Sequence, residues 1–221
     1  MPEQPPGQRG LTVKLRTARG RSTASQKWLQ RQLNDPYVRA AQQQGLRSRA
    51  AFKLMELDDR FHLLRGGSRV IDLGAAPGGW SQVAIKRGAS VVGVDLLPID
   101  PVAGATFLQG DFADDGMQDQ LRALLGGNAD LVLSDMAPNT TGHNATDHVR
   151  IVALAEAAYL FAIEMLAPGG GFVAKVFQGG SERQMLDAMK RHFAQVRHAK
   201  PQASRKESSE LYVVATGFRG G

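Results

Sequence analysis

Residues 69–81 read RVIDLGAAPGGWS, and this stretch decides the fold. Its first five residues form a short apolar run typical of a buried strand, and a helical pattern begins near residue 79. The small residues between them let the backbone approach a ligand closely at the carboxyl end of a strand, where open α/β sheets bind their ligands. A dinucleotide-binding turn would need glycine at position 76, which is alanine, and no Gly-Lys-Ser/Thr sequence of a P-loop is present. The turn therefore predicts a cofactor site of a different kind.

Short β-branched or aliphatic runs alternate with helical patterns through the rest of the chain. The expected strands are 69–73, 90–94, 106–109, 129–134, 171–177, 195–197 and 211–216. The expected helices between them are 79–87, 115–125, 145–167 and 181–192. This alternation predicts an α/β fold: a Rossmann-like, seven-stranded, mostly parallel sheet with helices on both faces. The last two runs are joined by a polar stretch without a helical pattern, which indicates an antiparallel hairpin at one edge.

The N-terminal part of the chain has a different composition from the rest. Residues 1–25 are rich in Gly, Pro, Arg, Ser and Thr and have too few large apolar groups to offset the entropy of ordering them, so we expect a disordered basic arm. Residues 26–65 show two helical patterns, separated at 34–36 by Asn-Asp-Pro. With 221 residues, 43% of them hydrophobic, we expect a single domain over 26–221 that begins with this helical extension.

The net charge of +6 is unevenly distributed along the chain. The first 53 residues hold eleven Lys or Arg against two acids, a local +9, and the remaining sixteen bases and nineteen acids give −3. Such a basic region favours a polyanion such as RNA, although a solubilising tail would have the same composition. We find no signal-peptide pattern and no apolar run that suits a membrane span, and we therefore expect a cytoplasmic protein.

Acidic residues follow three further expected strands. Asp95 comes twenty-one residues after Gly74, where a carboxylate can bind both hydroxyls of a ribose. Asp111 could meet an adenine amino group while the ring of Phe112 packs on the base, and Asp135 follows the fourth strand. Each acid alone could cap a helix or a turn. The ordered set, however, resembles the class I S-adenosylmethionine methyltransferases.

Composition and motifs narrow the range of possible methyl acceptors. The chain has no cysteine, which removes disulfides, thiolate metal sites and the nucleophile that pyrimidine C5 methylation normally requires. Amino-group methylation typically uses Asn/Asp-Pro-Pro-aromatic, whereas residues 135–139 read Asp-Met-Ala-Pro-Asn. An oxygen acceptor is therefore favoured. His143, Asp147 and His148 lie close in sequence, but nothing supplies further ligands, and we expect no metal site.

A ribose 2′-hydroxyl is weakly acidic and calls for a base or a cation that favours the alkoxide. A lysine can serve when a neighbouring positive charge and partial desolvation favour its neutral amine and carboxylates orient it. Lys175 lies in an otherwise apolar strand run, and Asp135 ends the preceding strand. Lys53 interrupts a helical pattern, and Glu210 begins the final run. These four are the candidate catalytic residues.

Eight segments resemble the FtsJ/RrmJ family of bacterial ribosomal RNA large-subunit 2′-O-ribose methyltransferases. They are RSRAAFKL (47–54), DLGAAPGGWS (72–81), DLLP (95–98), QGDF (109–112), SDMAPN (134–139), APGG (167–170), KVFQG (175–179) and YVVATG (212–217). The resemblance extends over roughly residues 28–217. It implies a class I methyltransferase that modifies a uridine of 23S rRNA on the assembled large subunit, with S-adenosylmethionine as cofactor.

The family's Lys-Asp-Lys-Glu tetrad falls by motif on Lys53, Asp135, Lys175 and Glu210, with Lys175 as the proton acceptor. The expected cofactor-binding residues combine those that the family implies with Gly74 and Phe112 from the strand-end pattern. In full they are Gly74, Gly78, Trp80, Asp95, Asp111, Phe112 and Asp135.

Arg47 and Arg49 lie next to Lys53 and are the expected contacts to RNA phosphates. We expect 23S rRNA or the large subunit as partner, not DNA or a membrane, and a monomer as the assembly. A 2′-O-methyltransferase of transfer RNA or of an mRNA cap stays open as an alternative. So does a non-catalytic ribosome-assembly factor, although an intact tetrad argues against it. The basic arm has no counterpart in the family pattern.

Overall fold

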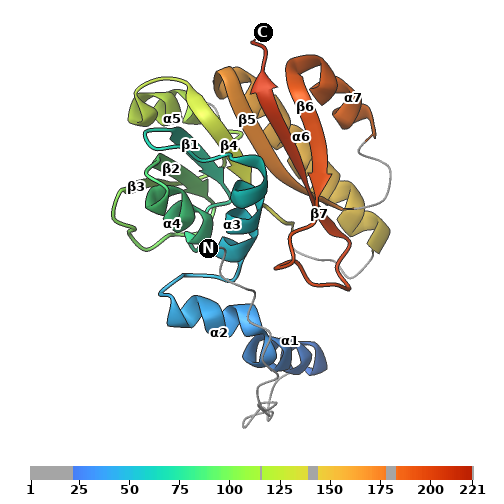
Figure 1. Cartoon of the computed structure of the whole chain (residues 1–221). Coiled ribbons are helices and arrows are strands. Elements are labelled where there is room, and N and C mark those ends of the chain that lie inside the picture. The colour runs from blue at the N-terminus through green and yellow to red at the C-terminus, as the bar shows by residue number, and fades with distance from the viewer. Residues whose placement is uncertain (1–21, 115, 139–143, 178–182, 221) are drawn as a thin grey trace.

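The computed structural model describes residues 22–114, 116–138, 144–177 and 183–220. Its centre is one seven-stranded sheet in the order β3-β2-β1-β4-β5-β7-β6 (Figure 1). The strands are β1 (Arg69–Leu73), β2 (Ser90–Asp95), β3 (Ala105–Gln109), β4 (Ala129–Ser134), β5 (Leu166–Phe177), β6 (Phe193–Ala199) and β7 (Glu210–Phe218). The first five are parallel, and β7 is antiparallel to both neighbours, β5 and β6. The predicted α/β fold and its edge hairpin are confirmed.

Helices cover both faces of the sheet because successive strand residues point to opposite sides. Val70 belongs to the core cluster that contains residues of α3 (Ala50–Phe61) and α4 (Gly79–Lys86), whereas its neighbour Ile71 belongs to a second cluster that contains residues of three further helices. Those three are α5 (Met117–Leu125), α6 (Asn144–Met165) and α7 (Arg183–His192). The same alternation separates Phe172 from Val173 in β5. The central strands are therefore buried on both faces, as the near-continuous apolar runs predicted.

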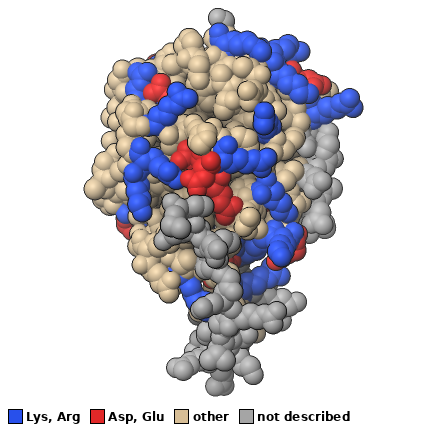
Figure 2. All heavy atoms as spheres, viewed as in Figure 1, with Lys and Arg blue, Asp and Glu red and all other residues tan. Residues whose placement is uncertain are grey.

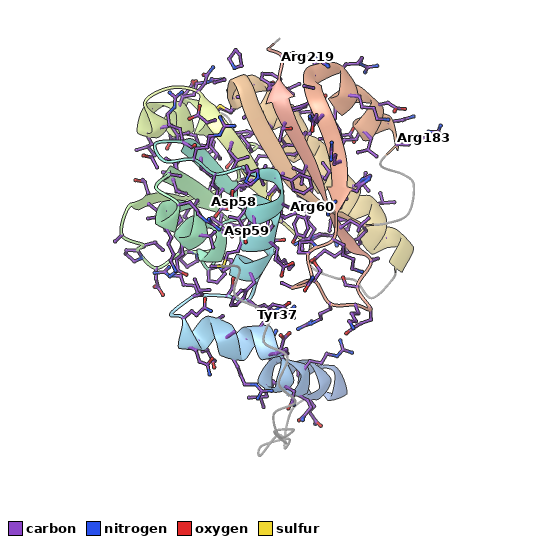
Figure 3. The ribbon with its side chains drawn as sticks, viewed as in Figure 1. Tyr37, Asp58, Asp59, Arg60, Arg183 and Arg219 are labelled. Atoms are coloured by element: carbon purple, nitrogen blue, oxygen red, sulfur yellow. The ribbon has the colours of Figure 1, made fainter. Side chains whose placement is uncertain are left out.

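Two further helices, α1 (Thr23–Asn34) and α2 (Pro36–Gln43), lie beside the main body (Figure 1). Asp35 separates them: it ends α1, and its Oδ1 accepts a hydrogen bond from the Tyr37 backbone N at 3.0 Å at the start of α2. Tyr37 belongs to α2, on the side of that helix next to the body (Figure 3). Its ring centroid lies 5.4 Å from that of Phe52 in α3. Helix α1 starts within the segment expected to be a disordered arm, because Ser22 caps it. Residues 1–21 of that arm lie outside the described residues.

Strand β5 begins at Leu166, five residues before the expected start at 171. The pairing register with β4 shifts between Ala129 and Leu131, opposite the Ala-Pro-Gly-Gly segment at 167–170. Within the described ranges, no helix has the length and apolar character needed to cross a membrane.

Candidate active site

The antiparallel direction of β7 places its first residues beside the end of β5. Glu210 pairs with Phe177, and Tyr212 pairs with Lys175. The end of β4 leads directly into Asp135 on the other side of β5. Helix α3 crosses this edge and contributes Lys53, which is buried together with Leu54 and Leu57. Segments far apart in the sequence therefore converge at the carboxyl ends of the parallel strands.

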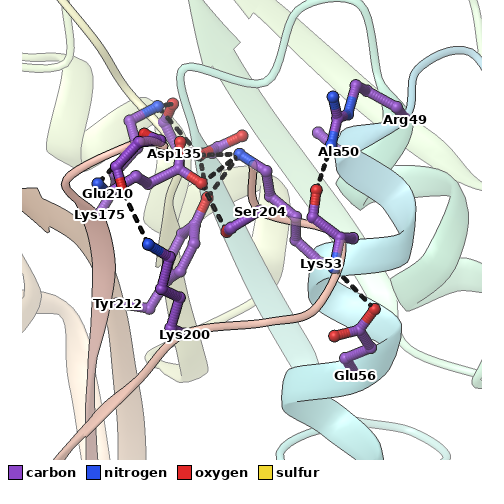
Figure 4. Close-up of polar contacts among 12 residues, drawn as sticks. Arg49, Ala50, Lys53, Glu56, Asp135, Lys175, Lys200, Ser204, Glu210 and Tyr212 are labelled. Atoms are coloured by element: carbon purple, nitrogen blue, oxygen red, sulfur yellow. Dashed lines mark hydrogen bonds and ion pairs between the residues drawn. The ribbon is translucent and has the colours of Figure 1, made fainter. Parts of the chain in front are cut away.

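The four candidate catalytic side chains form one cluster of alternating charge (Figure 4). Lys175 Nζ lies 3.0 Å from Asp135 Oδ1 and donates to the Asp135 carbonyl oxygen at 2.5 Å. Lys53 Nζ lies 2.7 Å from Glu210 Oε1 and 4.0 Å from Asp135 Oδ1. The two lysines are only 9% (Lys53) and 8% (Lys175) exposed. Each buried ammonium is thus paired with a carboxylate, as burial of charge requires.

Tyr212 completes this cluster and was missed by the sequence analysis. Its hydroxyl donates to Asp135 Oδ1 at 2.6 Å and accepts from Lys53 Nζ at 3.0 Å. A signal was available, because Tyr212 follows Glu210 by two positions in one strand and so shares its face. Ser204, whose Oγ donates to Glu210 Oε1 at 2.7 Å, lies in the polar β6–β7 connection and had no such signal.

The environment fixes the protonation of Asp135 and Tyr212. Burial alone would raise the pKa of Asp135, but the charges of Lys175 and Lys53 and the Tyr212 hydrogen bond hold that pKa below its ordinary value. Burial, reinforced by the charges of Asp135 and Glu210, raises the pKa of Tyr212 well above its ordinary value. Asp135 is therefore an ionised acceptor at neutral pH, and Tyr212 is a hydrogen-bond donor that keeps its proton.

The glycine-rich turn after β1 lies next to this cluster. Gly74 has φ +72°, and a Cβ there would lie 2.4 Å from Met136 Cγ, so the turn packs tightly against the segment that follows β4. Gly78, with φ +100°, directly precedes α4. Asp95 at the end of β2 accepts from the Ala76 backbone N at 2.9 Å through Oδ2. A narrow, backbone-lined edge of this kind fits a nucleoside-containing cofactor, with Asp95 beside it.

Comparison with known proteins identifies the family. A family model described as FtsJ-like methyltransferase matches residues 46–218. The chain belongs to this family.

Two bacterial relatives of this FtsJ-like chain are each named Ribosomal RNA large subunit methyltransferase E. The protein from Granulibacter bethesdensis is 73% identical over 98% of this chain and 95% of its own length. The protein from Gluconobacter oxydans is 70% identical over 96% of this chain and 79% of its own length. A crystal structure of a ribosomal RNA methyltransferase from Plasmodium falciparum has a TM-score of 0.71 and 28% identity, and it covers 79% of this chain and 100% of that chain.

The remaining cofactor candidates of this FtsJ-like chain differ in exposure. Asp111 is exposed, and its Oδ1 accepts from the Ala113 backbone N at 3.0 Å. Phe112 lies in the core, edge-on to Phe161 with ring centroids 5.8 Å apart. Trp80 is 3% exposed, and its Nε1 donates to the Ala50 carbonyl oxygen at 2.8 Å. Both rings therefore pack inside the protein, and the expected stacking of Phe112 on a base stays a prediction.

Asp72, the last polar residue inside β1, is a third residue that the sequence analysis missed. It is 1% exposed, and its Oδ2 accepts from Ser81 Oγ at 2.7 Å. Burial raises the pKa of Asp72 to about 7; the Ser81 hydrogen bond opposes this rise, and the negative charges of Asp135 and Asp95 add to it. The glycine-rich turn thus follows a buried carboxyl group whose pKa lies near neutral pH.

Arg47 and Arg49, the expected RNA contacts, are bonded to protein acceptors. The Arg49 guanidinium pairs with Asp35 and donates to the Ala203 carbonyl oxygen. The Arg47 guanidinium donates to three backbone carbonyls of two loops. Their role as RNA contacts stays a prediction. In the part of the chain that the structure describes, no group of three His, Asp or Glu side chains could hold a metal ion, and His143 lies outside that part.

Proposed function

We propose that this chain transfers a methyl group from S-adenosylmethionine to the ribose 2′-hydroxyl of a uridine in 23S rRNA of the large ribosomal subunit. The observation that carries the proposal is the pairing of Lys175 with Asp135 beside a second lysine, Lys53, at the edge of a methyltransferase sheet. The names of full-length relatives at 73% and 70% identity support the RNA substrate.

The chain's own side chains handle the proton. In its neutral amine form, Lys175 Nζ accepts the proton of the 2′-hydroxyl as the new oxygen–carbon bond forms and the sulfur–carbon bond breaks. Asp135 fixes the position of that amine through two hydrogen bonds, at 3.0 Å to its Oδ1 and 2.5 Å to its carbonyl. Lys53 and the Tyr212 hydroxyl share the same Oδ1, so they compete with Lys175 for the negative charge of Asp135. Glu210 holds Lys53 in place.

The residues present fit the cofactor. S-adenosylmethionine, when bound, supplies a methyl group on a positively charged sulfur. We assign its ribose to Asp95 and its adenine to the exposed Asp111, with the backbone of Gly74 and Gly78 lining the turn. Trp80 and Phe112 stay assigned to the cofactor site, although their rings are buried.

Surface charge supports a polyanionic substrate. Figure 2 shows many Lys and Arg side chains on the face that includes β6 and β7. Arg197, Lys200 and Lys206 are exposed members of this basic surface. Phosphates would be bound there by charge, without readout of bases. We further propose that the protein acts as a monomer in the cytoplasm.

Methyl transfer to defined RNAs tests the proposal. The full chain is incubated with methyl-labelled S-adenosylmethionine and either purified large subunits, free 23S rRNA or transfer RNA, and the product nucleosides are separated. We expect label in 2′-O-methyluridine from the large subunit. Label on a base would contradict the proposed chemistry, and label only in transfer RNA would contradict the proposed substrate.

A further inference from the structure

The Arg47 guanidinium joins two loops that are separate in sequence. Its Nη1 donates to the carbonyl oxygens of Pro77 at 3.1 Å and Asp100 at 2.5 Å. Its Nη2 donates to the Pro101 carbonyl oxygen at 2.6 Å. Pro77 belongs to the glycine-rich turn, and residues 100–101 belong to the loop between β2 and β3. Three acceptors on two loops use the planar, branched geometry of a guanidinium.

Asp95 links the same two loops by the opposite chemistry. Its Oδ2 accepts from the Ala76 backbone N at 2.9 Å, and its Oδ1 accepts from the Leu97 backbone N at 2.8 Å. One link is therefore a carboxylate that receives amide protons, and the other is a guanidinium that donates to carbonyls. Because Asp95 is the residue we assign to the ribose, the geometry of these loops also sets the position of that carboxylate.

Arg47 is itself held in place and lies against the turn. Its backbone N donates to Gln82 Oε1 at 2.8 Å, and Gln82 Nε2 donates to the Gly45 carbonyl oxygen at 3.2 Å. A Cβ on Gly78 would lie 3.3 Å from both Cδ and Nη1 of Arg47. The segment that follows continues into α3, which contributes Lys53 to the catalytic cluster. One short stretch of chain thus contacts both the cofactor loops and the acceptor cluster.

We propose that Arg47 is a positioning residue for the methyl donor: it holds the glycine-rich turn and the β2–β3 loop at the separation that S-adenosylmethionine requires. This inference rests on the proposed function, which assigns the cofactor to these loops. It differs from the expectation that Arg47 binds an RNA phosphate, because three of the five N–H donors of the guanidinium bind backbone carbonyls of the protein itself.

The two roles predict different behaviour of Arg47→Lys. Lysine keeps the positive charge but has a single nitrogen that cannot reach three carbonyls on two loops. If Arg47 positions the loops, affinity for the cofactor product falls about tenfold, since hydrogen bonds from a charged donor are lost. The KM for S-adenosylmethionine rises by a similar factor, while kcat at saturating donor and the KM for large subunits stay unchanged.

Calorimetric titration with S-adenosylhomocysteine in the absence of RNA measures this effect. The full chain, Arg47→Lys and Arg47→Ala are compared with Arg122→Lys. Arg122 is the matched control, because its Nη2 also donates to a backbone carbonyl, that of Glu164 at 2.8 Å, at a contact between α5 and α6. We expect weaker binding in both Arg47 variants and unchanged binding in Arg122→Lys.

Three results would overturn the inference. Arg47→Lys that binds S-adenosylhomocysteine like the parent chain, but needs more large subunit for half-maximal rate, would identify a phosphate contact. A lower melting temperature without any change in cofactor affinity would identify a purely structural role. An unsubstituted chain that does not bind S-adenosylhomocysteine would instead refute the proposed function, and this inference with it.

Discussion

The acceptor cluster and the cofactor edge are built differently. In the acceptor cluster, made of Lys53, Asp135, Lys175, Glu210 and Tyr212, the working groups are buried side chains that bond to one another. At the cofactor edge, the working groups are largely backbone, and the few polar side chains bind backbone atoms of neighbouring loops. Proton transfer needs groups of defined charge, whereas binding a nucleoside needs a defined shape. Substitutions should therefore affect rate in the first region and cofactor affinity in the second.

The largest effect is expected for Lys175→Ala. Removing the proton acceptor should lower the single-turnover rate of methyl transfer by about 10²–10⁴-fold. Affinity for S-adenosylhomocysteine should not change, because the cofactor edge is untouched. Lys86→Ala, an exposed lysine at the end of α4, is the control and should keep full activity. Full activity in Lys175→Ala would remove this residue from the proton path.

Asp72→Asn tests the contribution of the buried carboxyl group in β1 to stability. The pKa of Asp72 is raised to about 7 in the folded state, so this carboxyl group binds its proton more tightly in the folded than in the unfolded chain. Protonation of Asp72 therefore stabilises the folded state. That contribution is complete below the unfolded pKa and is lost as pH rises through about 7. At about 1.4 kcal/mol per pKa unit, the change between about pH 4 and about pH 8 is at most about 4 kcal/mol.

Urea unfolding of the parent chain and Asp72→Asn at about pH 5 and about pH 8 measures this contribution. The asparagine is always neutral, and its side-chain oxygen can still accept from Ser81. The variant should therefore gain stability relative to the parent chain as pH rises. A constant difference between the two proteins at both pH values would show that Asp72 does not titrate in this range.

Tyr212→Phe tests whether the hydroxyl belongs to the acceptor cluster. The ring keeps its packing against Trp80, but Asp135 loses one of the interactions that lower its pKa. The rate should fall about tenfold, in line with loss of a hydrogen bond to a charged group. The acid limb of the pH–rate profile should move to higher pH. Tyr159→Phe, which loses a hydroxyl bonded to His192 at 2.5 Å, is the control and should leave the profile unchanged.

The smallest effect is expected for Ser204→Ala. It removes one neutral donor to Glu210 and leaves the Lys53–Glu210 pair intact, so the rate should fall only about threefold. Cofactor affinity should be unaffected. Ser90→Ala, at an exposed position in β2, provides the comparison. A cofactor-affinity change in Ser204→Ala would mean that the two regions are not separable in the way described.

Periodicity and motif order were sufficient for the fold and for the acceptor tetrad. The alternating runs predicted a mostly parallel sheet with helices on both faces, and strand ends of a parallel sheet must meet at one edge. Lys53, from α3, was a candidate because it interrupts a helical pattern, and the resemblance to a family then assigned it to the tetrad. Its partner Tyr212 could have been found from the two-residue repeat of β7.

Partners of arginine side chains could not be predicted in the same way. Arg47 binds carbonyls 30, 53 and 54 residues away in sequence. A backbone carbonyl has no signature in the sequence, so a basic residue beside an active site is easily interpreted as a nucleic-acid contact. The burial of Asp72 could not be predicted either, because the sequence around it does not show whether the carboxyl group faces a ligand or the core.

The position of β7 between β5 and β6 has a consequence for synthesis of the chain. Except for Asp135, every residue assigned to the cofactor has been translated by Phe112, whereas the acceptor cluster needs Glu210 and Tyr212 from the last strand. The parallel strands β1 to β5 are complete at Phe177, before the chain has the residues of β7 that complete the catalytic cluster. Insertion of β7 between β5 and β6 is the long-range pairing step that ends this interval. The catalytic cluster is thus completed last, when Glu210 and Tyr212 join Lys53, Asp135 and Lys175.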